Sequence, residues 1–167
     1  MYRSDLAAVS GDGHGDDGVA RKVSEGAVMS DPTGGGAGAT IEDAVEIRLP
    51  ADSAYLSVLR TATAGLAARL DFTLDEIEDL RIAVDEACAM LLPQALDSAQ
   101  LTCRFRLTTE TIEVTVTIPT ADGQLPERNT FSWTVLAALA GDVDTGTDED
   151  RQVWIRLRKR RGVMGNT

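Results

Sequence analysis

Residues 73–92 constrain the fold of this chain most, because TLDEIEDLRIAVDEACAMLL has the pattern of one long amphipathic helix. Thr73 is followed three residues later by Glu76, the capping-box signature of a helix start. Apolar residues then recur at three- and four-residue steps, at Leu74, Ile77, Leu80, Val84, Ala87, Cys88 and Leu91. The opposite face carries Ile82, Glu86 and Met90 in one line. Because a fully exposed face would not need the apolar residues Ile82 and Met90, we expect part of that face to be in contact as well. Pro93 predicts where the helix ends or kinks.

Four other segments alternate apolar and polar residues in the manner of half-buried strands: residues 44–49, 101–107, 112–118 and 153–157. The short connection at residues 108–111 predicts a hairpin. A further helix is predicted from Asp52 or Ser53 onward, with an apolar face at Tyr55, Leu59, Ala62, Leu66 and Leu70, and a third over residues 131–139. Strands with one polar face, combined with helices, predict an α/β two-layer sandwich: a mostly antiparallel sheet with helices on one face.

The chain is expected to have three parts: a disordered Gly/Asp-rich tail (residues 1–43), a folded domain (44–161) and a short tail (162–167). His14, the single histidine, has no further ligands at metal-binding spacing, so no metal site is predicted. Met29 is an alternative start. The acidic residues 141–150 are expected to form a solvated turn before the last strand, because their order does not fit a calcium loop.

Charge and composition narrow the function classes. The net charge of −11 argues against nucleic acid as the main partner, because phosphate binding requires clustered Lys and Arg. The apolar runs are too short for a membrane span, and the N-terminus lacks the order of a secretory signal, so a cytoplasmic location is expected. Two cysteines at core-like positions do not form a disulfide framework.

The run LRIAVDEACAMLL resembles the first ATP-box helix of the histidine-kinase-like ATPase fold, as found in the RsbW-like anti-sigma-factor family. The similarity covers about residues 44–160, and TFSWTVLAALAGDV is similar to a segment of the high-GC bacterial branch in which FSW replaces a glycine-rich box. The resemblance implies a homodimeric anti-sigma factor that sequesters an RNA polymerase sigma factor and is regulated by an anti-anti-sigma (STAS) protein. It also implies that Arg60, on the first helix, contacts partner proteins, although an ordinary exposed arginine is the alternative.

The same resemblance lets the catalytic positions be checked. The family pattern Glu-Ala-Cys-x-Asn uses the Glu as base and the Asn as magnesium ligand; here Glu86 is kept and Met90 replaces the Asn. The family's adenine-binding Asp-x-Gly-x-Gly box is reduced to Asp122 and Gly123, and this dipeptide is typical of a turn in the first place. The second glycine box is replaced around residues 130–132, where Phe131 and Trp133 are expected to fill the space.

We therefore expect ATP binding to be impaired and magnesium to lack its ligand, since a thioether has little affinity for a hard cation. Glu86 is either a surviving base or a helix acid with a structural role. Two alternatives to the anti-sigma function stay open. One is an active serine/threonine kinase that phosphorylates the anti-anti-sigma protein, and the other is a small-ligand sensor with a remodelled pocket.

Overall fold

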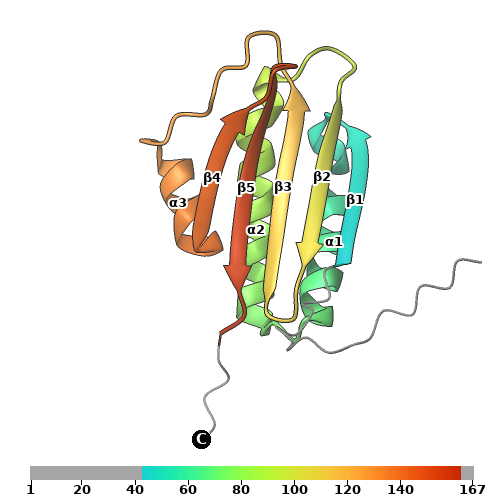
Figure 1. The fold of residues 1–167 in the computed structure, drawn as a ribbon, viewed down its shortest axis with the longest axis vertical. Helices are drawn as coiled ribbons and strands as arrows, with labels where there is room; N and C mark the ends of the chain where they lie inside the picture. The colour runs from blue at the N-terminus through green and yellow to red at the C-terminus, as the bar shows by residue number, and fades with distance from the viewer. Residues whose placement is uncertain (1–42, 163–167) are drawn as a thin grey trace, which may run out of the picture. The chain divides into compact units, whose positions relative to one another are not determined.

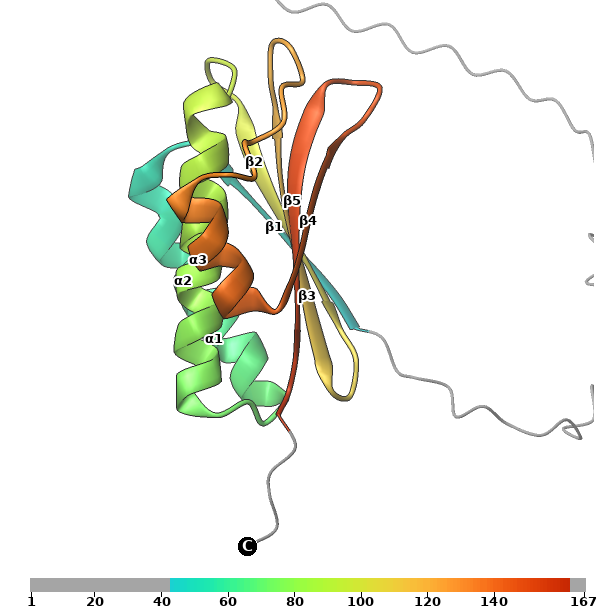
Figure 2. The same ribbon diagram turned by 90° about the vertical axis from the view of Figure 1, so that its left-hand side faces the viewer.

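The computed structural model describes residues 43–162, which form one sheet covered on one face by helices (Figures 1 and 2). The strands are β1 (Asp43–Pro50), β2 (Gln100–Leu107), β3 (Thr111–Pro119), β4 (Asp142–Thr147) and β5 (Gln152–Arg160). They pair in the order β1-β2-β3-β5-β4, each pair antiparallel. The helices are α1 (Leu56–Arg69), α2 (Leu74–Leu91) and α3 (Phe131–Ala140), with the short 3₁₀ helices η1 (Ser53–Tyr55) and η2 (Leu92–Gln94). The predicted α/β two-layer sandwich is confirmed.

The two predicted tails, residues 1–43 and 162–167, lie almost entirely outside the described residues. Asp43 is already the first residue of β1, and the described part ends at Gly162. The predictions that concern His14 and Met29 lie outside the described residues. No helix within residues 43–162 has the length and hydropathy needed to cross a membrane.

Helix α2 begins and ends as its sequence predicts. The Thr73 side chain accepts a hydrogen bond from the Glu76 N–H, and the Glu76 carboxylate accepts one from the Thr73 N–H at 2.8 Å, which completes the capping box. The helix ends at Leu91, where η2 carries the chain through Pro93. Leu74 is an exception to the predicted apolar face, because its side chain is exposed. Helical side chains lean toward the N-terminus, so Leu74, at the first position, extends past the packed layer.

The core lies between α2 and the inner face of the sheet. It contains Leu80, Val84 and Leu91 from α2 and Phe105, Val114 and Ile155 from the strands, among others. Cys88 and Cys103 are both buried there as free thiols. Burial raises the pKa of the Cys88 thiol to about 12, and the pKa of Cys103 also lies well above its usual value. Both cysteines are therefore protonated core residues at neutral pH.

Helix α1 buries a slightly different stripe from the predicted one. Its fully buried residues are Leu59, Thr63 and Ala67, while Leu66 and Leu70 pack at the edge of the core. Tyr55 does not belong to this stripe: it lies in η1 and is largely exposed. The 3₁₀ turn that precedes α1 changes the helical phase, which is why Tyr55 falls out of line with Leu59.

The acidic segment 141–150 is not a solvated turn throughout, so this prediction was wrong for its first half. Residues 142–147 form the edge strand β4, and the turn is confined to the residues that follow. Val143 and Thr145 alternate with Asp142 and Asp144 and pack toward the helices, with Thr145 buried. The aspartates face arginines of β5 across the sheet, which offsets the low strand propensity of Asp.

Gly146 in β4 gives a test of this edge strand. A Cβ atom at this position would lie 2.3 Å from Cζ2 of the Trp154 ring. We expect Gly146→Ala to lower the free energy of unfolding by about 1–3 kcal/mol, because the indole must move. Gly65→Ala is the matched control: nothing lies within 4 Å of the added methyl group in α1. It should instead raise stability by about 0.5–1 kcal/mol. Urea denaturation of both variants measures this, and effects of the same sign would contradict the placement of Trp154 over β4.

Candidate functional site

A cleft of about 490 Å³ lies where the C-terminal end of α2 meets the β3–α3 loop and the beginning of α3. Helix α2 and η2 contribute Ala89, Met90, Pro93 and Gln94 to its lining. The loop contributes Gln124, Leu125, Pro126 and Glu127, and α3 contributes Ser132 with its N-cap Thr130. The helix with the ATP-box resemblance and the segment that replaces the glycine boxes therefore come together at one site.

Local hydrogen bonds fix the loop that borders the cleft. The Thr120 hydroxyl donates to the Arg151 carbonyl at 2.8 Å and accepts from the Gly123 N–H at 2.9 Å. Gly123 has a φ of +70°, a conformation that favours glycine. At the far end of the loop, the Thr130 side chain caps α3 by accepting from the Trp133 N–H at 3.2 Å.

Asp122 and Gly123 belong to this turn and are not among the residues that line the cleft. The Asp122 carboxylate is exposed and accepts a hydrogen bond from the Gln124 N–H at 3.1 Å, as in an Asx turn. The neighbouring Gln124 does line the cleft. An adenine-binding role for Asp122 stays a prediction, and the turn accounts for both residues without it.

Glu86 lies on α2 four residues before Met90, so the two side chains follow one line along the helix. Met90 lines the cleft and Glu86 does not. Among the described residues, the Glu86 carboxylate makes no hydrogen bond or ion pair, and it is half-buried. Its role as a base stays a prediction, and no ion pair within residues 43–162 supports that role.

Phe131 does not fill the cleft, contrary to the prediction. Its side chain is 84% exposed, whereas Trp133 is buried in the core with the Arg128 guanidinium 5.1 Å from its ring centre. Thr130 fixes the start of α3, and this sets the helical phase. Trp133, Leu136 and Ala140 then face the core, and Phe131 points away from it. The cleft is open because both aromatic side chains lie outside it.

The cleft residues do not fit a magnesium–triphosphate group. Met90, the residue that the resemblance aligns with the magnesium ligand, lines the cleft, and Glu127 is the one carboxylate among the lining residues. No Lys or Arg is among them, and residues 43–162 contain no cluster of three metal-ligating side chains. Gln94 is among the lining residues, and its buried Oε1 atom has no hydrogen-bond partner within the described residues.

Arg60 lies away from the cleft lining, on the exposed side of the α1–α2 pair. Its Nε–H donates to Oδ2 of Asp85, the residue before Glu86, and the Arg60 side chain stays 45% exposed. The other carboxylate oxygen of Asp85 is buried and has no partner. Asp85 therefore holds the Arg60 guanidinium at the surface. The sequence carries no local signal for this pair, because 25 residues separate its members.

Comparison with known proteins supports the predicted resemblance, although the chain matches no known family model. It is 35% identical to the serine-protein kinase RsbW of Bacillus velezensis over 80 residues, which is 46% of this chain and 50% of that protein. It is 37% identical to the anti-sigma-F factor RsbW of Mycobacterium tuberculosis over 107 residues, which is 63% of this chain and 62% of that protein. The chain thus spans about half the length of the Bacillus relative and somewhat more of the mycobacterial one.

A solved structure is also similar to this chain. The crystal structure of RsbU and RsbW domains of a Mycobacterium tuberculosis protein superposes with a TM-score of 0.56, over 71% of this chain and 32% of that chain. The sequence identity is 13%, so this similarity concerns the fold alone. The chain is therefore a homologue of the RsbW proteins, and its described domain has the fold of an RsbW domain.

Proposed function

We propose that this chain is an anti-sigma factor that binds an RNA polymerase sigma factor and withholds it from the polymerase. The observation that carries the proposal is the 37% identity to the anti-sigma-F factor RsbW over 107 residues. Release is proposed to occur by partner switching, in which an anti-anti-sigma protein of the STAS class competes for the chain. The proposal includes pairing of two copies of the chain and a cytoplasmic location, where sigma factors meet the polymerase.

The partner surface is proposed to include Arg60. The ion pair with Asp85 restricts the guanidinium before binding, so less side-chain entropy is lost when a partner carboxylate arrives. Arg60 uses Nε–H in this pair, and a guanidinium has five N–H donors in a fixed fork. An incoming carboxylate can therefore bind Arg60 while Asp85 keeps it in position.

The alternative function, phosphorylation of the anti-anti-sigma protein, is favoured by the name serine-protein kinase that the Bacillus relatives carry. Phosphoryl transfer depends almost entirely on positioning and electrostatic stabilisation of the phosphates. The lining of the cleft contains no Lys or Arg and a single carboxylate, Glu127, and Glu86 lies outside it. We therefore propose that sequestration operates without phosphoryl transfer. A ligand sensor is a further candidate, supported by the open cleft and by Gln94, a lining residue whose buried Oε1 atom has no hydrogen-bond partner among the described residues.

The proposed function is tested by transcription in vitro with polymerase reconstituted with the cognate sigma factor. Adding the chain in equimolar amounts to sigma should abolish transcripts from the matching promoter, and adding the STAS protein should restore them. Polymerase that carries the primary sigma factor is the control and should be unaffected. Unchanged transcripts in the first reaction, or equal inhibition of both, would exclude the proposal.

A further inference from the structure

Strand β1 forms one edge of the sheet, and within residues 43–162 no strand pairs with its outer side (Figure 1). The Ala51 N–H donates to the Ala99 carbonyl at 2.9 Å, in the register of the β1–β2 ladder. Hydrogen-bonded pairs alternate along an antiparallel ladder, so every second residue of β1 directs its backbone groups toward β2. The residues between them direct their N–H and C=O groups outward: Ala44, Glu46 and Arg48. An edge of this kind is a template for a further strand.

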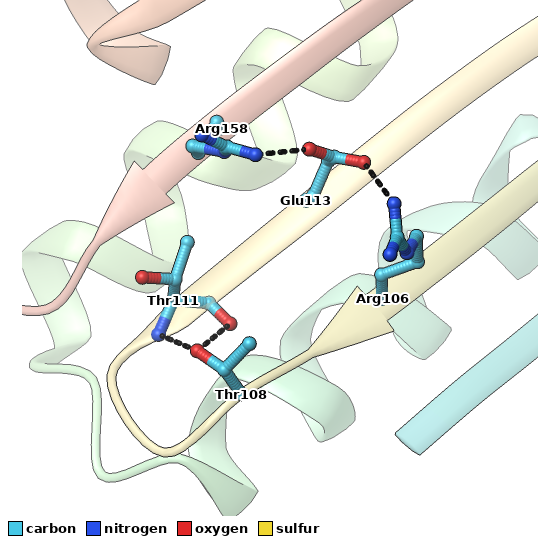
Figure 3. Close-up of a pocket in the computed structure, with 5 residues that line it drawn as sticks. All are labelled: Arg106, Thr108, Thr111, Glu113 and Arg158. Atoms are coloured by element: carbon cyan, nitrogen blue, oxygen red, sulfur yellow. Dashed lines mark hydrogen bonds and ion pairs between the residues drawn. The ribbon is translucent and has the colours of Figure 1, made fainter. Parts of the chain in front are cut away.

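Opposite charges meet across the strands on the face of the sheet that the helices leave uncovered. Glu113 of β3 lies directly across from Arg106 of β2 and Arg158 of β5, at 3.5 Å and 2.8 Å (Figure 3). Pairs of the same kind join β1 to β2 at 2.7 Å and β4 to β5 at 3.2 Å: Glu46 with Arg104, and Asp144 with Arg156. Every strand boundary of the described sheet therefore has an opposite-charge pair in register, which favours that register.

On this face β1 carries one anion and one cation, Glu46 and Arg48, two residues apart. The Arg48 side chain is 65% exposed and pairs with Glu46 of its own strand at 2.7 Å. If a second copy is related by a two-fold axis at Ile47, Glu46 of each copy lies opposite Arg48 of the other. Both residues direct their backbone groups outward, so they form the hydrogen-bonded pairs of the new ladder. Charge and hydrogen-bond phase therefore agree in this register.

Other registers and the other edge are less suitable. No other antiparallel register places Glu46 opposite Arg48, and registers centred on either residue place like charges opposite one another. A shift by one residue exchanges the two faces of the added strand. At the other edge of the sheet, β4 carries Asp142 and Asp144 but no basic residue, so pairing with itself would bring carboxylates together.

We propose that two copies of the chain form a symmetric dimer by antiparallel pairing of their β1 strands about Ile47, which makes their two sheets continuous. The apolar side of β1 supports this pairing. Its residues Val45, Ile47 and Leu49 are only half-buried, whereas the alternating apolar residues of β2 and β3 are buried. A strand beside β1 would cover them, and a two-fold interface of this kind is self-complementary. The inference rests on the pairing of two copies in the proposed function and specifies how they pair.

Sedimentation equilibrium of the full chain measures the dimer dissociation constant. We expect Arg48→Glu to raise it about tenfold or more, because both interchain pairs become pairs of carboxylates. Glu46 keeps Arg104 as its partner within the chain in this variant. A mixture of Arg48→Glu and Glu46→Arg should form a mixed dimer at concentrations where each variant alone is monomeric, because every interchain pair again joins opposite charges. Arg160→Glu is the control: Arg160 is an exposed, ion-paired residue on the same face of β5. Its dimer should be unchanged.

Hydrogen–deuterium exchange followed by NMR tests the position of the pairing. The amides of Glu46 and Arg48 should exchange more slowly in concentrated than in dilute solution, whereas that of Ile47 is protected by β2 in both. A dimer that is insensitive to Arg48→Glu, or whose Glu46 and Arg48 amides exchange rapidly, would overturn the inference but not the pairing of two copies. A monomer at all concentrations would overturn both and leave the transcription test of sigma factor binding unaffected. Protection of these amides at every dilution would assign the edge to a segment of the same chain and also overturn the inference.

Discussion

Replacing Phe105 by alanine is expected to lower the free energy of unfolding by about 3–5 kcal/mol. Phe105 lies in the middle of β2, is fully buried, and belongs to the core cluster between the sheet and the helices. Removing the ring loses its transfer free energy and leaves a cavity that the surrounding residues fill only in part. A domain of this size has a total stability of about 5–15 kcal/mol, so the substitution should remove a large share of it.

Phe131→Ala is the matched control for Phe105→Ala, since the same atoms are removed from a side chain that is 84% exposed. We expect a change within about 0.5 kcal/mol. Urea denaturation followed by the fluorescence of Trp133 and Trp154 measures both variants. A loss at Phe131 as large as the loss at Phe105 would mean that α3 is rotated and that Phe131 fills the cleft after all.

Replacing Arg60 by alanine is expected to weaken sigma factor binding about 10- to 100-fold, the range typical of an arginine at an interface hot spot. The domain should remain folded, because an ion pair with one exposed member contributes only about 0.2–1 kcal/mol. The expected loss comes from the guanidinium that Asp85 holds at the surface of the α1–α2 pair.

Arg69→Ala tests whether position matters more than charge. Arg69 lies on the same helix, is also exposed, and pairs with Asp43 of β1. We expect its affinity for the sigma factor to stay within about twofold of the unchanged chain, as for a charge outside the centre of an interface. Isothermal titration calorimetry measures both variants. Equal losses would show that only net charge matters, and no loss for Arg60→Ala would remove Arg60 from the partner surface.

Much of the fold follows from periodicity that the sequence shows directly. The Thr73–Glu76 capping box and the apolar face that includes Leu80 and Val84 place α2 within one residue of its observed bounds. The strict alternation of residues 101–107 and 112–118 places the central hairpin, and the similar pattern of residues 153–157 places β5. These segments are long enough for local pattern and tertiary burial to agree.

Strand β4 is missed because its stability comes from its neighbour. Its alternation covers only Val143 and Thr145, and Asp and Gly at the other positions favour a turn. The arginines that compensate Asp142 and Asp144 lie on β5, beyond the reach of a local pattern. The sequence therefore shows that this segment is acidic, but it does not show that the segment pairs with β5.

The candidate site is less predictable than the fold for a similar reason. Met90 is identified from the resemblance, but its neighbours in the cleft, such as Gln94 and Glu127, come from segments with no site signal. The exposure of Phe131 depends on the phase that Thr130 sets for α3, which composition cannot show. The Arg60–Asp85 pair likewise requires knowing how α1 packs on α2.

If the chain sequesters its sigma factor by binding alone, calorimetric titration of the cognate sigma factor into the full chain should show the same complex with and without nucleotide. The titration is performed without nucleotide and then with magnesium and ATP, and the STAS protein is afterwards added to the second sample with labelled ATP. We expect a saturable complex whose affinity is the same within about twofold in both conditions, and no label on the STAS protein. Absence of a complex, a complex that forms only with magnesium and ATP, or label transferred to the STAS protein would contradict it.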